Sequence, residues 1–149
     1  ATIPTLVGLS AQAAMVVVST RDHRFGWSPV PTAICLVGDV VVAVGLGVGG
    51  MVVIQNSYAA ATVRVKEGQT VVSTGLYGLV RHPMYTALYG LYLGWTLLTA
   101  NWLLGAAWIG TFTLLTATRI RHEEAMMIER FGDTYREYMK KTGRLLPRN

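Results

Sequence analysis

The fold of this chain is decided by residues 83–118, PMYTALYGLYLGWTLLTANWLLGAAWIGTFTLLTAT, which contain no acidic or basic side chain. One helix of this length would rise about 54 Å, whereas the hydrocarbon core of a bilayer is about 30 Å thick. Ala100-Asn101 divides the run into two segments of about 17 residues, at the short end of the spanning range. The stretch therefore predicts a helical hairpin in a membrane.

Polar clusters flank this hairpin. Arg81-His82 stands directly before it, and Arg119-Ile-Arg-His-Glu-Glu124 follows it. Because a hairpin returns the chain to the side from which it started, we expect His82 and Glu124 to lie at the same membrane surface. The spacing predicts a polar site there.

The composition indicates a membrane protein. Of the 149 residues, 52% are hydrophobic and 14% are charged, whereas soluble domains average about 25% charged residues. The length suggests a single domain, 1–149. Cys35, the single cysteine, offers neither a disulfide framework nor a metal-ligand pattern. The net charge of +5 lies mostly at segment ends, where basic residues meet anionic lipid, so it does not indicate a nucleic-acid partner.

The pattern along the chain predicts an all-α, polytopic integral membrane protein with about four membrane helices. We expect these helices at residues 3–19, 32–55, 83–99 and 102–118, with a polar loop at 56–82 and an amphipathic helical tail at 119–149. In the second helix, Gly45 and Gly49 form a small-xxx-small pair that allows close approach of a neighbour.

The distribution of basic residues predicts the orientation. Near the helix ends, the loop and the tail carry Arg64, Lys66, Arg81, Arg119, Arg121, Arg130 and Arg136. The opposite side carries only Arg21 and Arg24. The positive-inside rule therefore places the loop 56–82 and the tail in the cytosol.

The third helix has two different faces when it is projected at 100° per residue. One face carries His82, Tyr85, Tyr89, Tyr92 and Thr96, and the other carries Met84, Leu88, Leu91, Trp95 and Leu98. The aromatic face is either the lining of a polar cavity or an interfacial tyrosine belt. A belt occupies one depth, whereas this face climbs about 16 Å, so we favour the cavity.

Three carboxylates stand out. Glu124 lies in the apolar stripe of the tail helix, and Glu123 lies at the edge of that stripe near Arg119. A carboxylate in an apolar stripe is costly unless it is paired, so Glu124 predicts a cation from the protein or from a ligand. Asp39, the only formal charge in the second helix, is either a functional residue or the partner of a donor on a neighbouring helix.

These features resemble the isoprenylcysteine carboxyl methyltransferase family and its bacterial relatives, which include phospholipid N-methyltransferases. The matching pieces are Gly75-Leu-Tyr77, Arg81-His-Pro-Met-Tyr85, the uncharged hairpin with Asn101, Arg119-x-x-x-Glu-Glu124, Phe131-Gly132-x-x-Tyr135-x-x-Tyr138 and Leu146-Pro147. The resemblance covers about residues 56–147. The family often has a proline after the loop glycine, where this chain has Leu76.

The resemblance implies a membrane enzyme that uses S-adenosylmethionine to methylate a lipophilic acceptor entering from the bilayer. The carboxylate of a prenylcysteine-like acceptor is favoured, while a phospholipid amine and a small hydrophobic acid or thiol stay open. Arg119 would have the catalytic role, facing the acceptor or the transferring methyl. The cofactor would be held by Gly75, Tyr77, Arg81, His82, Tyr85, Glu123 and Glu124.

Two other classes of protein remain possible from the sequence. An NADPH-dependent membrane sterol or enone reductase has a similar carboxy-terminal plan, and Arg64, Lys66 and Arg81 could contact its phosphates. A non-enzymatic small membrane protein could bind a partner through its tail, although the polar clusters that flank the hairpin argue against it. No GxGxxG follows a strand pattern, so a soluble-type methyltransferase domain is not expected.

Overall fold

The computed structural model describes residues 13–14, 17–18, 20–22, 24–27, 31–56, 70–99 and 101–148. The helices with bounds in these ranges are α2 (Thr32–Gln55), α3 (Leu76–Leu79), α4 (Pro83–Thr99), α5 (Trp102–Phe131) and α6 (Asp133–Lys141). No strand occurs in the described ranges, where Val80 and Gly143 form an isolated bridge. The protein is therefore all-α, as predicted.

Two expected segments fall largely outside the described residues. Of the expected helix 3–19, positions 13–14 and 17–18 are described, and they are helical. Of the expected loop 56–82, residues 57–69 lie outside the description, including Arg64 and Lys66.

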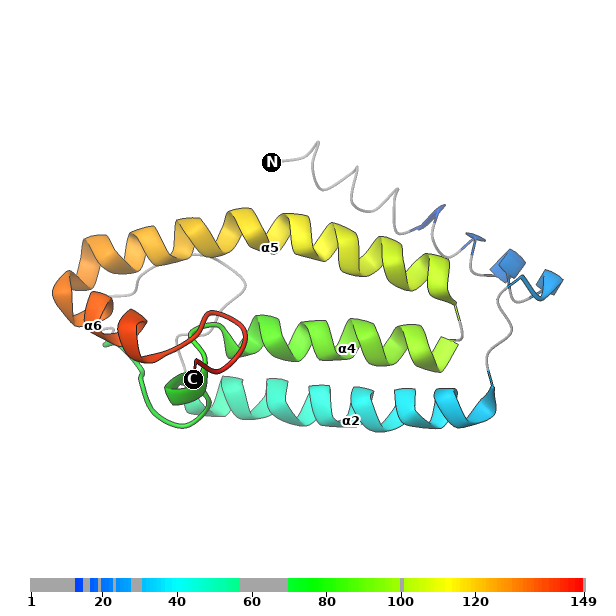
Figure 1. Cartoon of the computed structure of the whole chain (residues 1–149), viewed down its shortest axis with the longest axis horizontal. Coiled ribbons are helices and arrows are strands. Elements are labelled where there is room, and N and C mark those ends of the chain that lie inside the picture. The colour runs from blue at the N-terminus through cyan, green and yellow to red at the C-terminus, as the bar shows by residue number, and fades with distance from the viewer. Residues whose placement is uncertain are drawn as a thin grey trace.

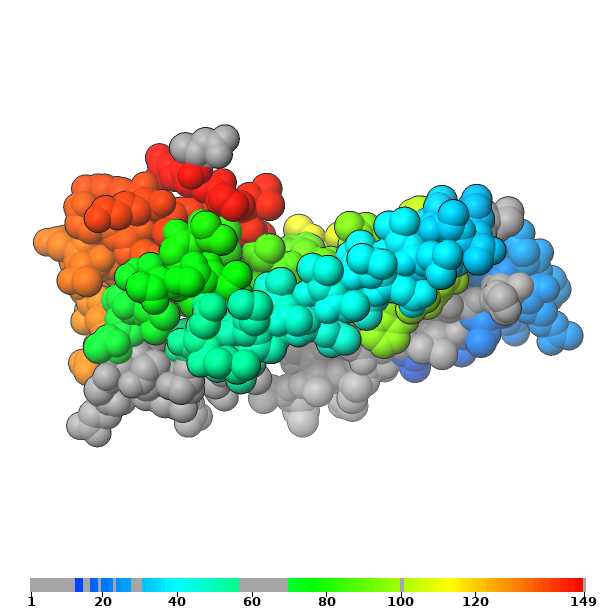
Figure 2. All heavy atoms as spheres, turned by 90° about the horizontal axis from the view of Figure 1, so that it is seen from below, coloured from blue at the N-terminus to red at the C-terminus, as the bar shows by residue number. Residues whose placement is uncertain are grey.

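The long helices α2, α4 and α5 lie side by side, with α4 between the other two (Figure 1). At one end of this layer, α6 folds back from α5 and the chain returns to the start of α4. The space-filling view shows α6 and the carboxy-terminal residues gathered at this same end (Figure 2). The segments on the two sides of the hairpin therefore meet at one end of the helical layer.

The turn of the hairpin lies where the sequence predicts it, since α4 ends at Thr99 and α5 begins at Trp102. Asn101 turns the chain between them. Its side chain accepts a hydrogen bond of 2.7 Å from the backbone N–H of Leu104 and is 1% exposed. Asparagine is among the preferred residues at this position because its side-chain oxygen satisfies a free N–H of the first helical turn.

The structure differs from the expected boundary at residue 118, because α5 continues without a break to Phe131. No glycine or proline stands between residues 111 and 131. The helix ends at Gly132, whose φ of 55° lies in the left-handed region that favours glycine. The polar residues from 119 onward are thus rigidly continuous with the uncharged part of the helix.

The closest approach of α2 and α4 is at Gly38 and Gly94. A Cβ on Gly38 would lie 2.8 Å from the carbonyl oxygen of Gly94, and a Cβ on Gly94 would lie 2.8 Å from the backbone nitrogen of Val42. Gly45 also lies in this contact, as expected, because a Cβ there would lie 3.0 Å from the side chain and 3.2 Å from the backbone nitrogen of Leu91. Gly49 does not need to be glycine for this contact, because a Cβ there would lie an ordinary 4.0 Å from the Cβ of Ala87.

The surfaces that point away from these contacts are apolar. Both α2 and α5 are long and apolar enough to cross a membrane, whereas α4 has 17 residues. Val40, Val44 and Leu114 are exposed on them, as lipid-facing side chains would be. Asp39 is also exposed on α2.

Candidate functional site

The charged cluster is built where the start of α4 meets the charged end of α5. His82, directly before α4, lies between two adjacent carboxylates of α5. Its Nδ1 is 3.5 Å from Oε2 of Glu123, and its Nε2 is 3.5 Å from Oε1 of Glu124. The structure thus brings together the two polar clusters that the hairpin pattern placed at one membrane surface.

Glu124 is buried at 3% exposure and is paired with two guanidinium groups. Arg81 Nε donates to Oε1 at 2.9 Å, and Arg144 Nε and Nη2 donate to Oε2 at 3.0 and 2.7 Å. Burial raises the pKa of this carboxyl, but the hydrogen bonds from Arg144 and Arg81 outweigh it, and the pKa falls below its ordinary value of 4.5. The cation that the sequence predicts for Glu124 therefore comes from the protein.

Glu123 is less buried and faces a different set of donors. Its Oε1 accepts from the Tyr85 hydroxyl at 2.7 Å and from Arg119 Nε at 3.0 Å. Burial raises the pKa of Glu123, but the hydrogen bonds from His82, Tyr85 and Arg119 lower it by more than burial raises it, so the net shift is downward. Both glutamates lie beyond the uncharged part of α5, 102–118, and both are held in the ionised form.

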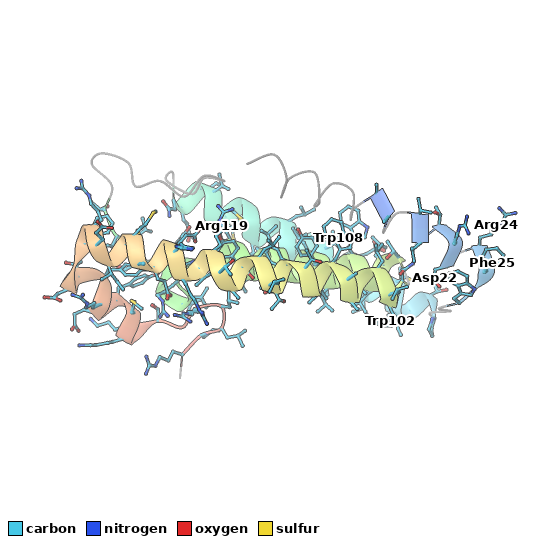
Figure 3. All side chains as sticks on the ribbon, turned by 90° about the horizontal axis from the view of Figure 1, so that it is seen from above. Asp22, Arg24, Phe25, Trp102, Trp108 and Arg119 are labelled. Atoms are coloured by element: carbon cyan, nitrogen blue, oxygen red, sulfur yellow. The ribbon has the colours of Figure 1, made fainter. Side chains whose placement is uncertain are left out.

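Arg119 lies at the border between the uncharged and the charged parts of α5. Figure 3 shows it on the same edge of the helix as Trp108, which belongs to the uncharged part. The Arg119 side chain is 40% exposed while it pairs with Glu123 one turn on. The guanidinium therefore stays accessible at the point where the helix leaves its apolar stretch.

Arg81 donates hydrogen bonds to a carboxylate and to two backbone carbonyl groups. Beside its bond to Glu124, its Nη1 donates to the carbonyl oxygen of Met139 at 3.0 Å and to that of Thr142. Its side chain is 8% exposed. Arg81 thus joins α5 to the end of α6 and the residue that follows it.

Gly75 has a backbone conformation that favours glycine and lies against the end of the Gln55 side chain. Its φ is 59°, and a Cβ would lie 2.6 Å from Oε1 of Gln55. The same Gln55 oxygen accepts a hydrogen bond of 2.9 Å from the backbone N–H of Leu76. The resembling family often has a proline at the position of Leu76, and a proline could not donate this bond. The bond from Leu76 to Gln55 therefore accompanies the departure from the family pattern.

Tyr77 is held by both of its polar groups. Its carbonyl oxygen accepts from the Tyr138 hydroxyl at 2.7 Å. Burial raises the pKa of its phenol, and a hydrogen bond with the Asn56 side chain opposes that shift. Tyr77 therefore links the end of α2 to α6.

The tyrosines of α4 face α5. Tyr85, Tyr89 and Tyr92 surround Phe112, with ring centroids 6.2, 4.8 and 4.9 Å from it. Tyr92 also stacks on Trp108 at 5.5 Å. These half-buried rings form an aromatic row along the two helices and not a belt at one depth, and the lining of a cavity by them stays a prediction.

One polar atom of the cluster lacks a hydrogen bond. His82 Nε2 is buried and has no hydrogen-bond partner among the described residues. Buried polar atoms are nearly always bonded, so an unsatisfied one beside carboxylates and guanidinium groups can take a polar ligand. S-Adenosylmethionine carries an ammonium, a sulfonium, a carboxylate and an aromatic base, and this set of carboxylates, imidazole, guanidinium groups and phenol rings fits those groups.

Residues 34–134 match the family described as phospholipid methyltransferase. The chain belongs to this family. The predicted resemblance to isoprenylcysteine carboxyl methyltransferases and their phospholipid relatives is confirmed. The matched region includes most of the cluster, from the loop glycine to Glu124, and does not reach Arg144.

Curated relatives of this family member are methyltransferases. The protein-S-isoprenylcysteine O-methyltransferase of Schizosaccharomyces pombe is 32% identical over 91 residues, 61% of this chain and 38% of that protein. The human enzyme of the same name is 31% identical over 78 residues, 52% of this chain and 28% of that protein. The methanethiol S-methyltransferase of Pseudomonas deceptionensis is 38% identical over 72 residues, 48% of this chain and 26% of that protein. The matches span between about a quarter and two fifths of these relatives.

The fold is that of a solved membrane protein. The structure of a eukaryotic intramembrane Ras methyltransferase, isoprenylcysteine carboxyl methyltransferase, superposes with a TM-score of 0.80 at 20% identity. The superposition covers 99% of this chain and 53% of that one. The chain therefore has the helical arrangement of part of that structure.

Arg144 is the member of the cluster that the sequence did not point to. It follows Gly143 in a tail rich in basic residues, where nothing in its spacing separates it from Lys140, Lys141 or Arg148. The sequence signal that could have indicated Arg144 is its position two residues before Leu146-Pro147, which matches the family.

Proposed function

We propose that this protein is an S-adenosylmethionine-dependent methyltransferase that moves a methyl group to a lipophilic acceptor. The observation that carries the proposal is the position of His82 between Glu123 and Glu124, at the end of a membrane hairpin. Membership of the family and the methyltransferase relatives support it.

When bound, S-adenosylmethionine supplies a methyl group on a positively charged sulfur. The residues proposed to hold it are Gly75, Tyr77, Arg81, His82, Tyr85, Glu123 and Glu124. Glu123, the more exposed carboxylate, would face its cationic groups, Glu124 would hold Arg81 in place, and His82 Nε2 would contact its polar groups. Because methyl transfer is an in-line displacement, the main work of these side chains is to orient the reactants.

Arg119 is proposed to meet the acceptor. It is 40% exposed at the end of the uncharged part of α5, where a lipophilic acceptor would present its reacting group. A guanidinium can bind both oxygens of a carboxylate, so we favour a carboxylate acceptor of the prenylcysteine type. A carboxylate is ionised at neutral pH and needs no general base, whereas a protonated amine acceptor would need one.

We also propose that the loop 56–82 and the tail 119–149 face the cytosol. The basic residues on that side of the hairpin support this orientation. The acceptor would then enter the site from the bilayer at the cytosolic surface.

The test uses the full chain purified in detergent. Calorimetry should detect binding of S-adenosylhomocysteine and no binding of NADP. His82→Gln should weaken this binding, whereas His122→Gln, which changes an exposed histidine of α5, should bind as the parent does. Transfer of radiolabelled methyl to a panel of a prenylcysteine, phosphatidylethanolamine, a hydrophobic acid and a thiol then identifies the acceptor. Binding of NADP without binding of S-adenosylhomocysteine would overturn the proposal in favour of a reductase.

A further inference from the structure

The residues after α6 run along the start of α4. We call residues 142–145 the carboxy-terminal strap. Val80 and Gly143 form a parallel bridge, in which the N–H of Arg81 donates to the carbonyl oxygen of Gly143 at 2.8 Å. The N–H of His82 donates to the carbonyl oxygen of Arg144 at 3.0 Å. The strap is therefore bonded to the backbone of the same residue whose imidazole lies between the two carboxylates.

The strap also reaches the site with a side chain. Arg144 donates to both oxygens of Glu124, with Nε 3.2 Å from Oε1 and 3.0 Å from Oε2 and Nη2 2.7 Å from Oε2. The Arg144 side chain is 53% exposed, whereas that of Glu124 is 4% exposed. A guanidinium from the surface thus holds a carboxylate that is otherwise closed to solvent.

Two arginines acting together fix the rotation of the Glu124 carboxylate. Arg81 donates to Oε1, and Arg144 donates to Oε1 and to Oε2. In this orientation the carboxylate stays 3.5 Å from His82 Nε2, which remains without a hydrogen bond among the described residues. If Arg144 were absent, Oε2 would lose its donor and the carboxylate could turn toward the imidazole.

We propose that Arg144 is a positioning residue of the cofactor site, which fixes the Glu124 carboxylate 3.5 Å from His82 Nε2, short of a hydrogen bond, so that His82 Nε2 stays available to the ligand. This inference depends on the proposed function. Arg144 acts through Glu124 and the backbone of His82, and it need not touch the cofactor itself. The strap thereby makes the geometry of the site depend on the last residues of the chain.

The turn that delivers Arg144 depends on glycine. A Cβ on Gly143 would collide with the backbone carbonyl oxygen of Leu146. The Thr86 hydroxyl donates to the carbonyl oxygen of Leu145 at 2.8 Å and secures the strap on its far side. The direction of the Arg144 side chain is therefore set by backbone contacts on both sides of it.

The experiment compares Arg144→Ala and Arg144→Lys with Arg148→Ala. Arg148 is an exposed arginine four residues on, and it serves as the matched control. In calorimetry on the full chain, Arg144→Ala should raise the dissociation constant of S-adenosylhomocysteine at least about tenfold, or about 1.4 kcal/mol. Arg144→Lys should recover part of the affinity, because the lysine ammonium restores the positive charge but not the paired N–H donors that bond both oxygens of Glu124. Arg148→Ala should leave the constant within about twofold of the parent, which corresponds to about 0.4 kcal/mol.

The pH dependence of binding gives a readout that a loss of stability alone would not move. The groups that face Glu124 are Arg81 and His82 before α4, Arg144 on the strap, Tyr135 on α6 and Glu123 on its own helix. Removal of Arg144 takes away a cation that favours the ionised carboxylate. The acid limit of S-adenosylhomocysteine binding should therefore move to higher pH in Arg144→Ala and stay in place in Arg148→Ala.

The outcomes separate the two proposals. If the parent protein does not bind S-adenosylhomocysteine, the proposed function fails and the role of Arg144 fails with it. If the parent binds but Arg144→Ala matches Arg148→Ala in affinity and acid limit, only the role of Arg144 is overturned. Should Arg144→Ala not fold, Arg144→Lys decides the question, because affinity equal to that of the parent would show that the fork on Glu124 is dispensable.

Discussion

The hydroxyl of Tyr138 donates a hydrogen bond of 2.7 Å to the carbonyl oxygen of Tyr77. The bond joins α6 to α3, which are separated by the whole hairpin in the sequence. Burial raises the pKa of the Tyr138 phenol to about 12, so the group stays protonated and remains a donor. This bond is therefore one of the contacts that link the carboxy-terminal tail to the loop proposed to hold the cofactor.

Tyr138→Phe should destabilise the protein by about 1 kcal/mol, because the Tyr77 carbonyl loses its partner while the aromatic packing is kept. The melting temperature in detergent should fall by roughly 2–4 °C. Tyr135→Phe is the control, since Tyr135 is equally buried in α6 and its hydroxyl makes no hydrogen bond among the described residues. Equal melting temperatures for the two variants would show that the bond contributes nothing.

Glu124→Gln should weaken the binding of S-adenosylhomocysteine more than Glu123→Gln. Glu124 is the more buried of the two, and its loss of charge leaves the buried Arg81 without its counter-ion. The loss of a buried, charged hydrogen bond costs about 1.5–3 kcal/mol, so the dissociation constant should rise roughly tenfold or more. Calorimetry on both variants checks the order, and a larger effect for Glu123→Gln would reverse the assignment.

The sequence predicts the hairpin and the site because both depend on strong, local signals. The uncharged run with Asn101 at its middle locates the turn. Because a hairpin brings its two ends together, the polar clusters at these ends define the site. The apolar stripe around Glu124 likewise predicts that a cation pairs with its carboxylate, but it does not identify the residue that supplies the cation. These features come from hydrophobicity and charge, which are read directly from residue types.

Other features depend on contacts that no periodicity records. Arg144 enters the site only because the strap turns back over the start of α4, and it is one arginine among several in the tail. The bond from Leu76 to Gln55 depends on how the end of α2 meets the loop. The expected boundary at residue 118 is wrong, because a change from apolar to charged residues does not end a helix where no helix-breaking residue stands.

The stability of the charged end should depend on pH on the acid side. Burial raises the pKa of Glu124, but bonds from Arg144 and Arg81 lower it below 4.5, and the net shift of Glu123 has the same direction. A carboxyl with a lowered folded pKa stabilises the protein above its unfolded pKa, and this contribution is lost as the pH falls through the folded value. The melting temperature should therefore change little between neutral pH and about 5. It should decline as the pH falls below the ordinary carboxyl pKa of 4.5.

Thermal unfolding in detergent as a function of pH measures this decline. Glu124→Gln removes one of the two titrating groups, so its curve should be flatter below the ordinary carboxyl pKa than that of the parent. Parallel curves for the two proteins would mean that Glu124 does not contribute to the acid sensitivity.

Arg119→Ala should lower methyl-transfer turnover strongly and leave the affinity for S-adenosylhomocysteine within a few-fold of the parent. The reason is the position of Arg119, 40% exposed at the end of the apolar part of α5 and one turn before Glu123. An interaction made mainly in the transition state appears as equal losses in kcat and kcat/KM. As a surface ion pair alone, Arg119 and Glu123 would be worth only about 0.3–0.5 kcal/mol. Arg121→Ala changes an exposed arginine of the same helix and should behave as the parent does. Steady-state kinetics on both variants distinguishes the two roles, and an unchanged turnover in Arg119→Ala would reduce Arg119 to the surface pair seen with Glu123.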